Sequence, residues 1–279
     1  MKNNSFITGY ALAFSICFLS NLCFCQELRY DDGLFIEKMI TKDTSIHRYS
    51  VDNIVCKPDY IFLFDYYFTN KNGEKQNIAG ERNSDFENQK YETTEINSQS
   101  LITIENIKMT VTDNLKLFLR MDSTYAQTVI KYEYCDLNGD IITSEETGLI
   151  ENTKNVWLHP PRNFYFKVLE INPFPFIRID TVKNWSWPFQ VGGFWSDSKW
   201  KEWQGRLDIE TTYEKQEDEI LETKFGKLQC RVVVATASSK IGKSFLKSYF
   251  NSVFGFVKLE YTNIDSTKIF MELIHVSHI

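Results

Sequence analysis

Tryptophan and proline have the most uneven distribution of any residue types in this chain. All six tryptophans lie between Trp157 and Trp203, and five of the six prolines lie between Pro160 and Pro188. Indole rings on loops stiffened by proline offer large flat area at low entropic cost, which suits an apolar or sugar-stacking surface. The ligand-binding candidates are therefore Trp157, Trp185, Trp187, Trp195, Trp200 and Trp203, with Arg162 beside them. The competing interpretation is a satellite core beneath a long loop, in which Trp185 and Trp187 could expose one ring and bury the other.

The polar residues of the chain suggest no familiar chemistry. Arg162 could pair with Glu170 or with an anionic ligand, and His159 beside Pro160 has no serine or carboxylate at a recognisable spacing, so it is expected to be structural. Asp136, Asn138 and Asp140 faintly resemble a calcium loop, but Gly139 stands fourth rather than sixth, and a hairpin turn explains them better. No nucleophile elbow, zinc-protease motif or phosphate loop is present. The sequence predicts no catalytic residue, no metal site and no cofactor, although an unfamiliar enzyme stays open.

Three cysteines remain once the N-terminal segment is set aside, namely Cys56, Cys135 and Cys230. Their separations fit no zinc-binding spacing. One disulfide with one remaining thiol is an open alternative in an oxidising compartment. Cys230 stands in a run typical of a buried strand, so the favoured prediction is that all three are small buried hydrophobic residues.

The elements that position these residues are expected to be strands. Tyr60–Thr69 ends before Asn72-Gly73, and Val129–Leu137 ends before Asn138-Gly139, a dipeptide that favours type I′ hairpin turns. The other predicted strands are Leu101–Met109, Leu115–Arg120, Phe164–Ile171, Gly205–Tyr213, Lys227–Thr236, Phe256–Tyr261 and Lys268–His275. This pattern predicts a mainly β fold with a curved antiparallel sheet, either a half-barrel or an open barrel, with the aromatic and proline-rich loops covering its mouth or edge.

Two segments are expected to depart from this pattern. Ser244 could cap a short helix near the C-terminus, with Phe245, Leu246, Tyr249 and Phe250 on one face and Gly255 ending it. The polar stretch 71–100 shows no period, so its part from Ile78 onward is expected to be an exposed excursion or loosely ordered.

Composition limits the class of protein. The chain has 279 residues, 43% of them hydrophobic, and a net charge of −6, with 22 Phe and 14 Tyr. Such a chain can bury a core, which excludes disordered and fibrous classes, and its mild acidity makes nucleic acid an unlikely partner in electrostatic terms. Without a proline-, glycine- or serine-rich linker, residues 26–279 are expected to form a single β-rich domain.

The first 25 residues are typical of a secretory signal peptide. Lys2 precedes an apolar run from Tyr10 to Leu19, and Cys23 and Cys25 occupy the −3 and −1 positions of a cleavage site before Gln26. Lipidation at Cys23 or Cys25 and a retained membrane anchor are the alternatives. Because no later apolar run is comparable, the mature chain is expected to have no transmembrane span and to be periplasmic or extracellular, with outer-membrane association left open.

The C-terminal quarter carries a family resemblance. Phe225-Gly226-Lys227-Leu228-Gln229-Cys230, then Ile241-Gly242, Phe245–Phe250 and Gly255–Glu260, resemble the closing strands of the LolA/LolB-like superfamily of envelope proteins. The resemblance covers roughly residues 205–275 and rests on glycine and apolar positions. It implies a curved half-barrel whose concave face takes up an acyl chain or another apolar ligand, and it implies no catalytic residue.

Three functions from different classes remain open. The first is an envelope protein that binds an apolar or lipid-like ligand between the sheet and the tryptophans. The second is a carbohydrate-binding or glycan-processing envelope protein that uses exposed Trp platforms. The third is a structural or assembly protein of the envelope. The first is favoured, as a non-catalytic binding protein.

Overall fold

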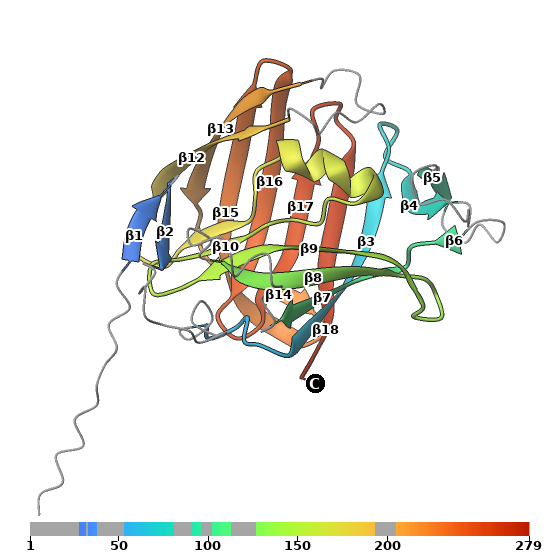
Figure 1. The fold of residues 1–279 in the computed structure, drawn as a ribbon, viewed down its shortest axis with the longest axis horizontal. Helices are drawn as coiled ribbons and strands as arrows, with labels where there is room; N and C mark the ends of the chain where they lie inside the picture. The colour runs from blue at the N-terminus through green and yellow to red at the C-terminus, as the bar shows by residue number, and fades with distance from the viewer. Residues whose placement is uncertain are drawn as a thin grey trace, which may run out of the picture.

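The computed structural model describes residues 28–31, 33–37, 53–80, 91–95, 102–112, 127–192 and 205–278, and one large antiparallel sheet dominates it (Figure 1). Within these ranges the sheet comprises sixteen strands: β3 (Tyr60–Thr69), β4 (Lys75–Gly80), β5 (Tyr91–Glu95), β6 (Ile102–Thr103), β7 (Asn106–Thr112), β8 (Thr128–Cys135), β9 (Ile141–Glu151), β10 (Asn155–Leu158), β11 (Phe176–Arg178), β12 (Asn184–Val191), β13 (Leu207–Lys215), β14 (Glu219–Thr223), β15 (Gly226–Ser239), β16 (Gly242–Asn251), β17 (Gly255–Thr262) and β18 (Lys268–His278). A separate hairpin consists of β1 (Leu28–Asp31) and β2 (Leu34–Glu37).

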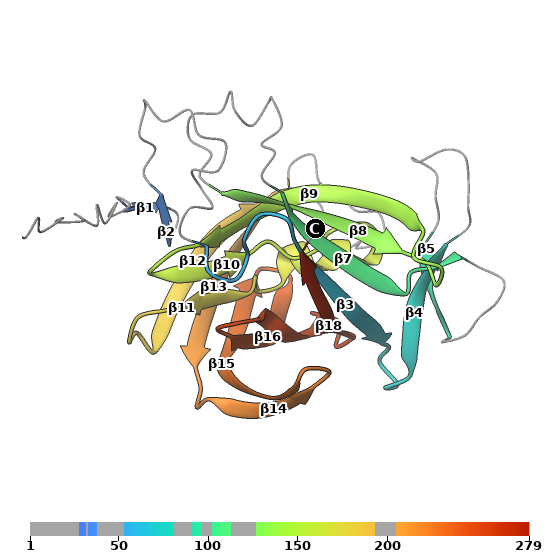
Figure 2. The ribbon, with the colours of Figure 1, turned by 90° about the horizontal axis from the view of Figure 1, so that it is seen from below.

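The strands follow the order β11-β10-β9-β8-β7-β3-β18-β17-β16-β15-β13-β12, and every neighbouring pair is antiparallel. Figure 2 shows this sheet curling around an interior. Its two end strands, β11 and β12, are not hydrogen-bonded neighbours, so the sheet is not closed into a barrel. The prediction of a mainly β, curved antiparallel fold is confirmed.

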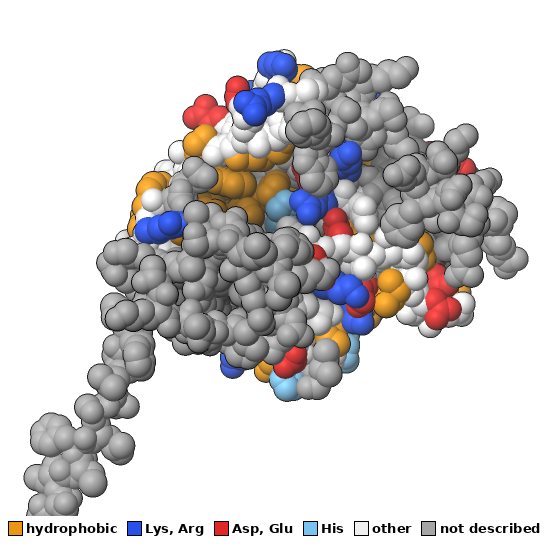
Figure 3. Space-filling model, in the orientation of Figure 1, with side chains coloured by type: hydrophobic (Ala, Val, Ile, Leu, Met, Phe, Trp, Pro, Cys, Tyr) orange, Lys and Arg blue, Asp and Glu red, His pale blue; other side chains and the backbone are white. Residues whose placement is uncertain are grey.

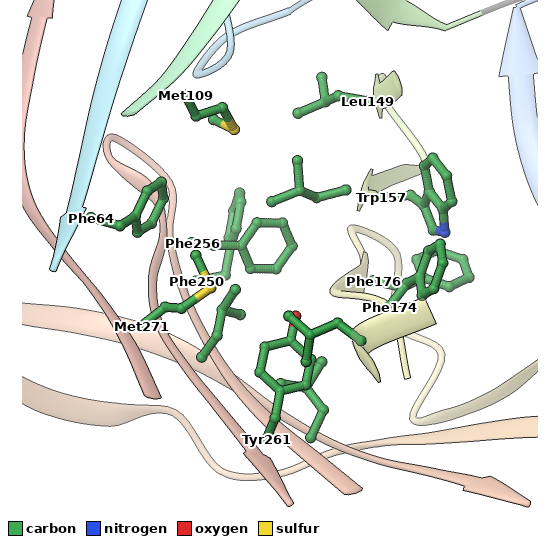
Figure 4. Packing of buried hydrophobic residues seen from close by; sticks show 14 of the residues in the cluster. Phe64, Met109, Leu149, Trp157, Phe174, Phe176, Phe250, Phe256, Tyr261 and Met271 are labelled. Carbon is green, nitrogen blue, oxygen red and sulfur yellow. The ribbon is translucent and has the colours of Figure 1, made fainter. Parts of the chain in front are cut away.

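The core lies inside the curl because the strands alternate between buried and exposed side chains. In β13, Leu207, Ile209 and Tyr213 are buried, whereas Asp208 and Glu210 are exposed. This period of two places one face against the interior and the other in solvent. The buried apolar side chains of the described residues form one contiguous cluster that reaches from β2 to β18 (Figure 4).

The 3-10 helix η2 (Phe164–Ile171) lies inside the curl (Figure 1). Phe166, in its first turn, has no exposed surface, and its ring contacts Tyr66 of β3 and Tyr134 of β8. The prediction of a strand over Phe164–Ile171 was therefore wrong. Prolines at 160, 161, 173 and 175 flank the segment and cannot donate to a ladder, so it satisfies its backbone internally, with the amide of Phe166 donating to the carbonyl of Asn163 at 3.0 Å.

The predicted C-terminal helix is also absent, because its residues form β16. Ser244, Leu246 and Ser248 are buried and alternate with the exposed Phe245 and the half-buried Lys247. The strand pairs with β15 on one side and β17 on the other. In a strand the four apolar positions that suggested a helical face are divided between the two faces of the sheet, and pairing along both edges favours the strand.

The Asn-Gly hairpins form, but not with the predicted type I′ turn. In the β3–β4 connection the amide of Gly73 donates to the carbonyl of Asn70 at 3.0 Å, and only the glycine of the Asn72-Gly73 pair has a positive φ, of 85°. Asp136 and Gly139 repeat this arrangement between β8 and β9. These are four-residue turns followed by a glycine bulge. Ser266 takes the glycine position in the β17–β18 turn, at a φ of 71°.

Several other predictions have definite outcomes. Ile78 and Ala79 of β4 have no exposed surface, so the expectation of an exposed excursion was wrong at these positions. The predicted strand Leu115–Arg120 and the signal peptide, including both lipidation candidates, lie outside the described residues. No helix within the described ranges combines the length and apolarity that crossing a membrane requires.

Candidate functional site

The structure divides the predicted tryptophan site. Trp157 lies on β10, and Trp185 and Trp187 lie on β12, at opposite ends of the strand order. The expectation that Trp185 and Trp187 stand on a covering loop was wrong, since they pair with Tyr213 and Thr211 of β13. Because β12 is an end strand, it tolerates the missing amide of a proline in its middle. Trp195, Trp200 and Trp203 lie outside the described residues.

Aromatic rings join the two ends of the sheet where hydrogen bonds do not. The ring centroids of Trp157 and Trp187 are 5.5 Å apart in an edge-to-face contact, and Trp187 stacks on Phe189 at 4.4 Å. Trp185 stacks on Tyr213 at 5.4 Å. We call this set the aromatic seam; its members are Trp157, Phe174, Phe176, Trp185, Trp187, Phe189 and Tyr213. Figure 4 shows Trp157, Phe174 and Phe176 grouped on one side of the core.

The β1–β2 hairpin lies against the aromatic seam. A β-carbon added at Gly33, in the hairpin turn, would come within 2.9 Å of Cδ1 of Trp187. Phe35 of β2 donates its amide to Oδ1 of Asn155 at 3.1 Å and accepts a bond from Nδ2 of Asn152 at 2.8 Å. The hairpin is thus fastened to the start of β10 and to the turn before it, and it covers the Cδ1 edge of Trp187.

A recess of about 850 Å³ adjoins the seam. Trp187, Phe189 and Ile209 contribute its apolar boundary, and the polar boundary consists of Gln190, Asp208, Glu210 and Ser238, with Pro188 between them. Figure 3 shows hydrophobic side chains gathered in a hollow at the upper left, over β12 and β13, with a histidine and basic side chains beside it. A recess of this volume falls within the range typical of small-molecule sites.

The seam contains buried donors without acceptors. Among the residues that the structure describes, Nε1 of Trp157, Trp185 and Trp187 has no hydrogen-bond partner, and neither does the hydroxyl of Thr211, the cross-strand neighbour of Trp187. Trp157 and Trp187 are only 4% and 7% exposed. Each unpaired buried donor costs about 1–3 kcal/mol. Both the site hypothesis and the satellite-core alternative must account for this cost.

His159 is structural, as the sequence predicted. Its Nδ1 lies 2.8 Å from the carbonyl oxygen of Pro160, and its ring lies 4.7 Å from that of Phe174. Burial lowers the pKa of His159 to about 4. The imidazole is therefore neutral at neutral pH and forms part of the packing around the seam.

Arg162 lies in a buried polar network. Its Nη1 is 3.8 Å from Oε1 of Glu170, the partner suggested by the sequence, and its Nε is 3.4 Å from Oε2 of Glu145. Glu145 also accepts the amide of Arg162 at 2.7 Å and the hydroxyl of Tyr134. Burial raises the pKa of Glu145 and of Glu170, and the neighbouring Arg162 opposes both shifts. The network fastens the start of η2 to β8 and β9.

Sequence reasoning missed Glu145 because it is distant in sequence from Arg162 and follows no motif. The same holds for Glu151, whose carboxylate accepts the amides of Ile54, Val55 and Cys56 at 2.8 to 2.9 Å. Phe174 and Phe189 lay within the aromatic and proline-rich window, but only the fold brings them against Trp157 and Trp187.

Cys56, Cys135 and Cys230 are buried, and no disulfide joins any two of these three cysteines, which are those of the described residues. Burial raises the pKa of the Cys230 thiol to about 11 and that of Cys56 well above its ordinary value. Thiols with such pKa values are poor nucleophiles at neutral pH. The prediction of buried structural cysteines is confirmed.

The described part of the chain contains no group of three His, Cys, Asp or Glu side chains arranged to hold a metal ion. The residues that resembled a calcium loop form a turn instead. Oδ1 of Asp136 accepts the amides of Asn138 and Asp140, each at 2.9 Å. This Asx arrangement is the hairpin turn that the sequence favoured over a calcium site.

Comparison with known proteins gives distant structural neighbours only. No family model and no curated protein matches the sequence. A candidate lipoprotein from Parabacteroides distasonis ATCC 8503 is 12% identical with a TM-score of 0.45, over 80% of this chain and 97% of that one. A candidate exported protein with a YmcC-like fold from Bacteroides fragilis NCTC 9343 is 11% identical with a TM-score of 0.40, over 80% and 98%. The hypothetical lipoprotein YmcC from Escherichia coli K12 is 10% identical with a TM-score of 0.33, over 83% and 94%.

With these identities and TM-scores, the likenesses establish neither a family nor a shared function for this chain. None of the three neighbours is described as a LolA or LolB protein. The resemblance of the C-terminal strands to that superfamily stays a prediction.

Proposed function

We propose that this protein is an exported protein of the cell envelope that binds an apolar or lipid-like ligand at the aromatic seam and does not catalyse a reaction. The observation that carries the proposal is the recess bounded by Trp187 and Phe189, which opens beside the seam. Export rests on the signal-like residues 1–25. Flat rings next to a concave, partly apolar space are the usual composition of a small-molecule site.

The seam also offers a physical route for a ligand. β11 and β12 are joined by ring contacts and not by a hydrogen-bond ladder, so side chains there can part without breaking backbone pairing. Burying a methylene group gains about 0.8 kcal/mol. Ten buried methylenes would gain about 8 kcal/mol before the cost of ordering the chain, which is compatible with micromolar binding or weaker.

The chemistry of the neighbouring carboxylates supports binding over catalysis. Glu145 accepts bonds from Tyr134 and Arg162, and Glu170 lies against the same guanidinium. These groups are engaged in holding η2 in place. A glycan platform is less favoured, because Trp157 and Trp187 are buried and Trp185 has one face on Tyr213.

The test uses the mature protein purified without detergent. We expect native mass spectrometry to detect a bound lipid-like molecule, and the delipidated protein to bind N-phenyl-1-naphthylamine at one saturable site. Trp187→Ala should weaken dye binding at least fivefold. Phe245→Ala, which removes a 43% exposed ring of β16 outside the seam, should leave it unchanged. Absence of both a copurified ligand and dye binding would contradict the proposal, and an indole fluorescence change on adding glycans would favour the carbohydrate alternative.

A further inference from the structure

The unpaired donors of the seam are grouped on one part of the molecule. Trp187 and Thr211 are directly opposed on β12 and β13, so their side chains share a face of the sheet. The ring of Trp157 meets that of Trp187 edge to face. Nε1 of both indoles and Oγ1 of Thr211 lack hydrogen-bond partners in the described part of the chain, and Thr211 has no exposed surface.

These grouped N–H and O–H donors need a hydrogen-bond acceptor. Buried side-chain donors in folded proteins nearly always have a partner, and an indole can only donate. Trp187 also bounds the recess, so one of the unpaired donors belongs to a residue at the point where the seam meets the recess. A ligand group that brings a lone-pair oxygen to this point would satisfy what the chain leaves unsatisfied.

The electrostatics indicate that this oxygen is uncharged. Asp208 and Glu210 bound the recess and would repel an anionic head group. The nearby Arg178 is already paired with Asp180. His159 offers no positive charge at neutral pH, because burial lowers its pKa to about 4. A carboxylate would therefore meet the two acidic side chains at the boundary of the recess, whereas an ester carbonyl carries no charge for them to repel.

The covering hairpin restricts how the oxygen arrives. Gly33 lies against Cδ1 of Trp187, the ring carbon bonded to Nε1. The β1–β2 hairpin is a sheet of its own, and its backbone bonds to the main body pass through Phe35 to Asn152 and Asn155. In the part of the chain that the structure describes, the edge of Trp187 that carries Nε1 thus lies beneath a hairpin that shares no strand pairing with the main sheet.

We propose that the ligand of the aromatic seam is a neutral acyl ester, whose carbonyl oxygen accepts a hydrogen bond from the indole N–H of Trp187 while its acyl chain occupies the recess. This inference rests on the proposed function, because it specifies the ligand of the same site. It distinguishes an acyl ester from a plain hydrocarbon and from a free fatty acid.

The test compares the delipidated wild-type protein with Trp187→Phe, which keeps an aromatic face and removes the donor. Methyl dodecanoate, tridecane and sodium dodecanoate, each delivered from methyl-β-cyclodextrin, compete against bound N-phenyl-1-naphthylamine. We expect Trp187→Phe to weaken methyl dodecanoate about tenfold, the equivalent of one hydrogen bond, and to change tridecane less than about twofold. Sodium dodecanoate should bind the wild type more weakly than the methyl ester does.

Two further measurements keep the test decisive if Trp187→Phe misfolds. Thr211→Val removes the neighbouring unpaired hydroxyl and keeps the indole N–H of Trp187, so it should leave the binding of both methyl dodecanoate and tridecane unchanged. The ultraviolet resonance Raman band that reports indole N–H hydrogen bonding should shift in the wild type on adding methyl dodecanoate and not on adding tridecane. Equal losses for ester and alkane, or no Raman shift, would overturn the inference and leave the binding function standing. Failure of all three probes to displace the dye, or failure of the dye itself to bind, would instead overturn the proposed function.

Discussion

Trp187 offers the sharpest test of how the sheet ends are held together. Its ring is 7% exposed and contacts those of Trp157, Phe174 and Phe189 at centroid distances of 5.5, 5.1 and 4.4 Å. Replacing a buried Trp by Ala costs about 3–5 kcal/mol through lost transfer energy and the cavity that remains. We therefore expect Trp187→Ala to lower the free energy of unfolding by about 3–5 kcal/mol.

Trp187→Phe separates packing from hydrogen bonding. The phenyl ring has three heavy atoms fewer than indole, which costs about 2 kcal/mol at about 0.8 kcal/mol for each buried carbon. Removal of an unpaired buried N–H returns about 1–3 kcal/mol. The two effects nearly cancel, so the free energy of unfolding should stay within about 1 kcal/mol of the wild type.

Urea denaturation followed by far-ultraviolet circular dichroism measures both variants. The slope against urea concentration should be the same in the wild type and both variants, and only the midpoints should differ. If Trp187→Phe costs as much as Trp187→Ala, the indole N–H has a partner in solution and the reasoning about unpaired donors is refuted. If Trp187→Ala costs less than about 1 kcal/mol, the rings do not hold the sheet ends together.

Three other predictions concern the turns, the buried network and pH. Ser266→Gly should raise the free energy of unfolding by about 0.5–1 kcal/mol in the same urea assay, because glycine adopts the φ of 71° without strain. The control is Ser252→Gly, in a turn where that residue has no positive φ, and it should not raise the free energy of unfolding. Glu145→Gln should lower the free energy of unfolding by about 1–3 kcal/mol, since an amide nitrogen would face Nε of Arg162. The control is Glu219→Gln at an exposed ion pair, which should change the free energy of unfolding by less than about 1 kcal/mol. The pKa of His159 is 6.5 in the unfolded chain, and burial lowers it to about 4 in the folded protein. The stability that the neutral imidazole contributes is therefore present above pH 6.5, and about 3 kcal/mol of it is lost as the pH falls to 4. His159→Gln should remove that loss in pH-dependent thermal unfolding, and an unchanged pH profile would contradict the burial of the imidazole.

Local pattern was enough to predict most of the fold. Alternating apolar residues and Asn-Gly dipeptides located the hairpins on either side of Gly73 and Gly139. The pattern failed at β16, where Phe245, Leu246, Tyr249 and Phe250 have helical spacing, although in the strand they are divided between its two faces. The choice there depends on β15 and β17, which lie elsewhere in the sequence and supply backbone partners along both edges.

The site was only partly readable from the sequence. The concentration of indoles identified Trp157, Trp185 and Trp187 as a group, but it placed the last two on a loop because Pro188 argued against a strand. Proline is tolerated there because β12 pairs on one edge only, which is a property of the sheet order. The link between Arg162 and Glu145 likewise depends on the position of η2 inside the curl, for which no local signal exists.

A crystal structure with methyl 12-bromododecanoate tests the central claim most directly. The account predicts an anomalous bromine peak in the recess beside Trp187 and Phe189, with the ester carbonyl within hydrogen-bond distance of Nε1 of Trp187. An empty recess at saturating ligand, or bromine peaks only at sites remote from β12, would contradict it.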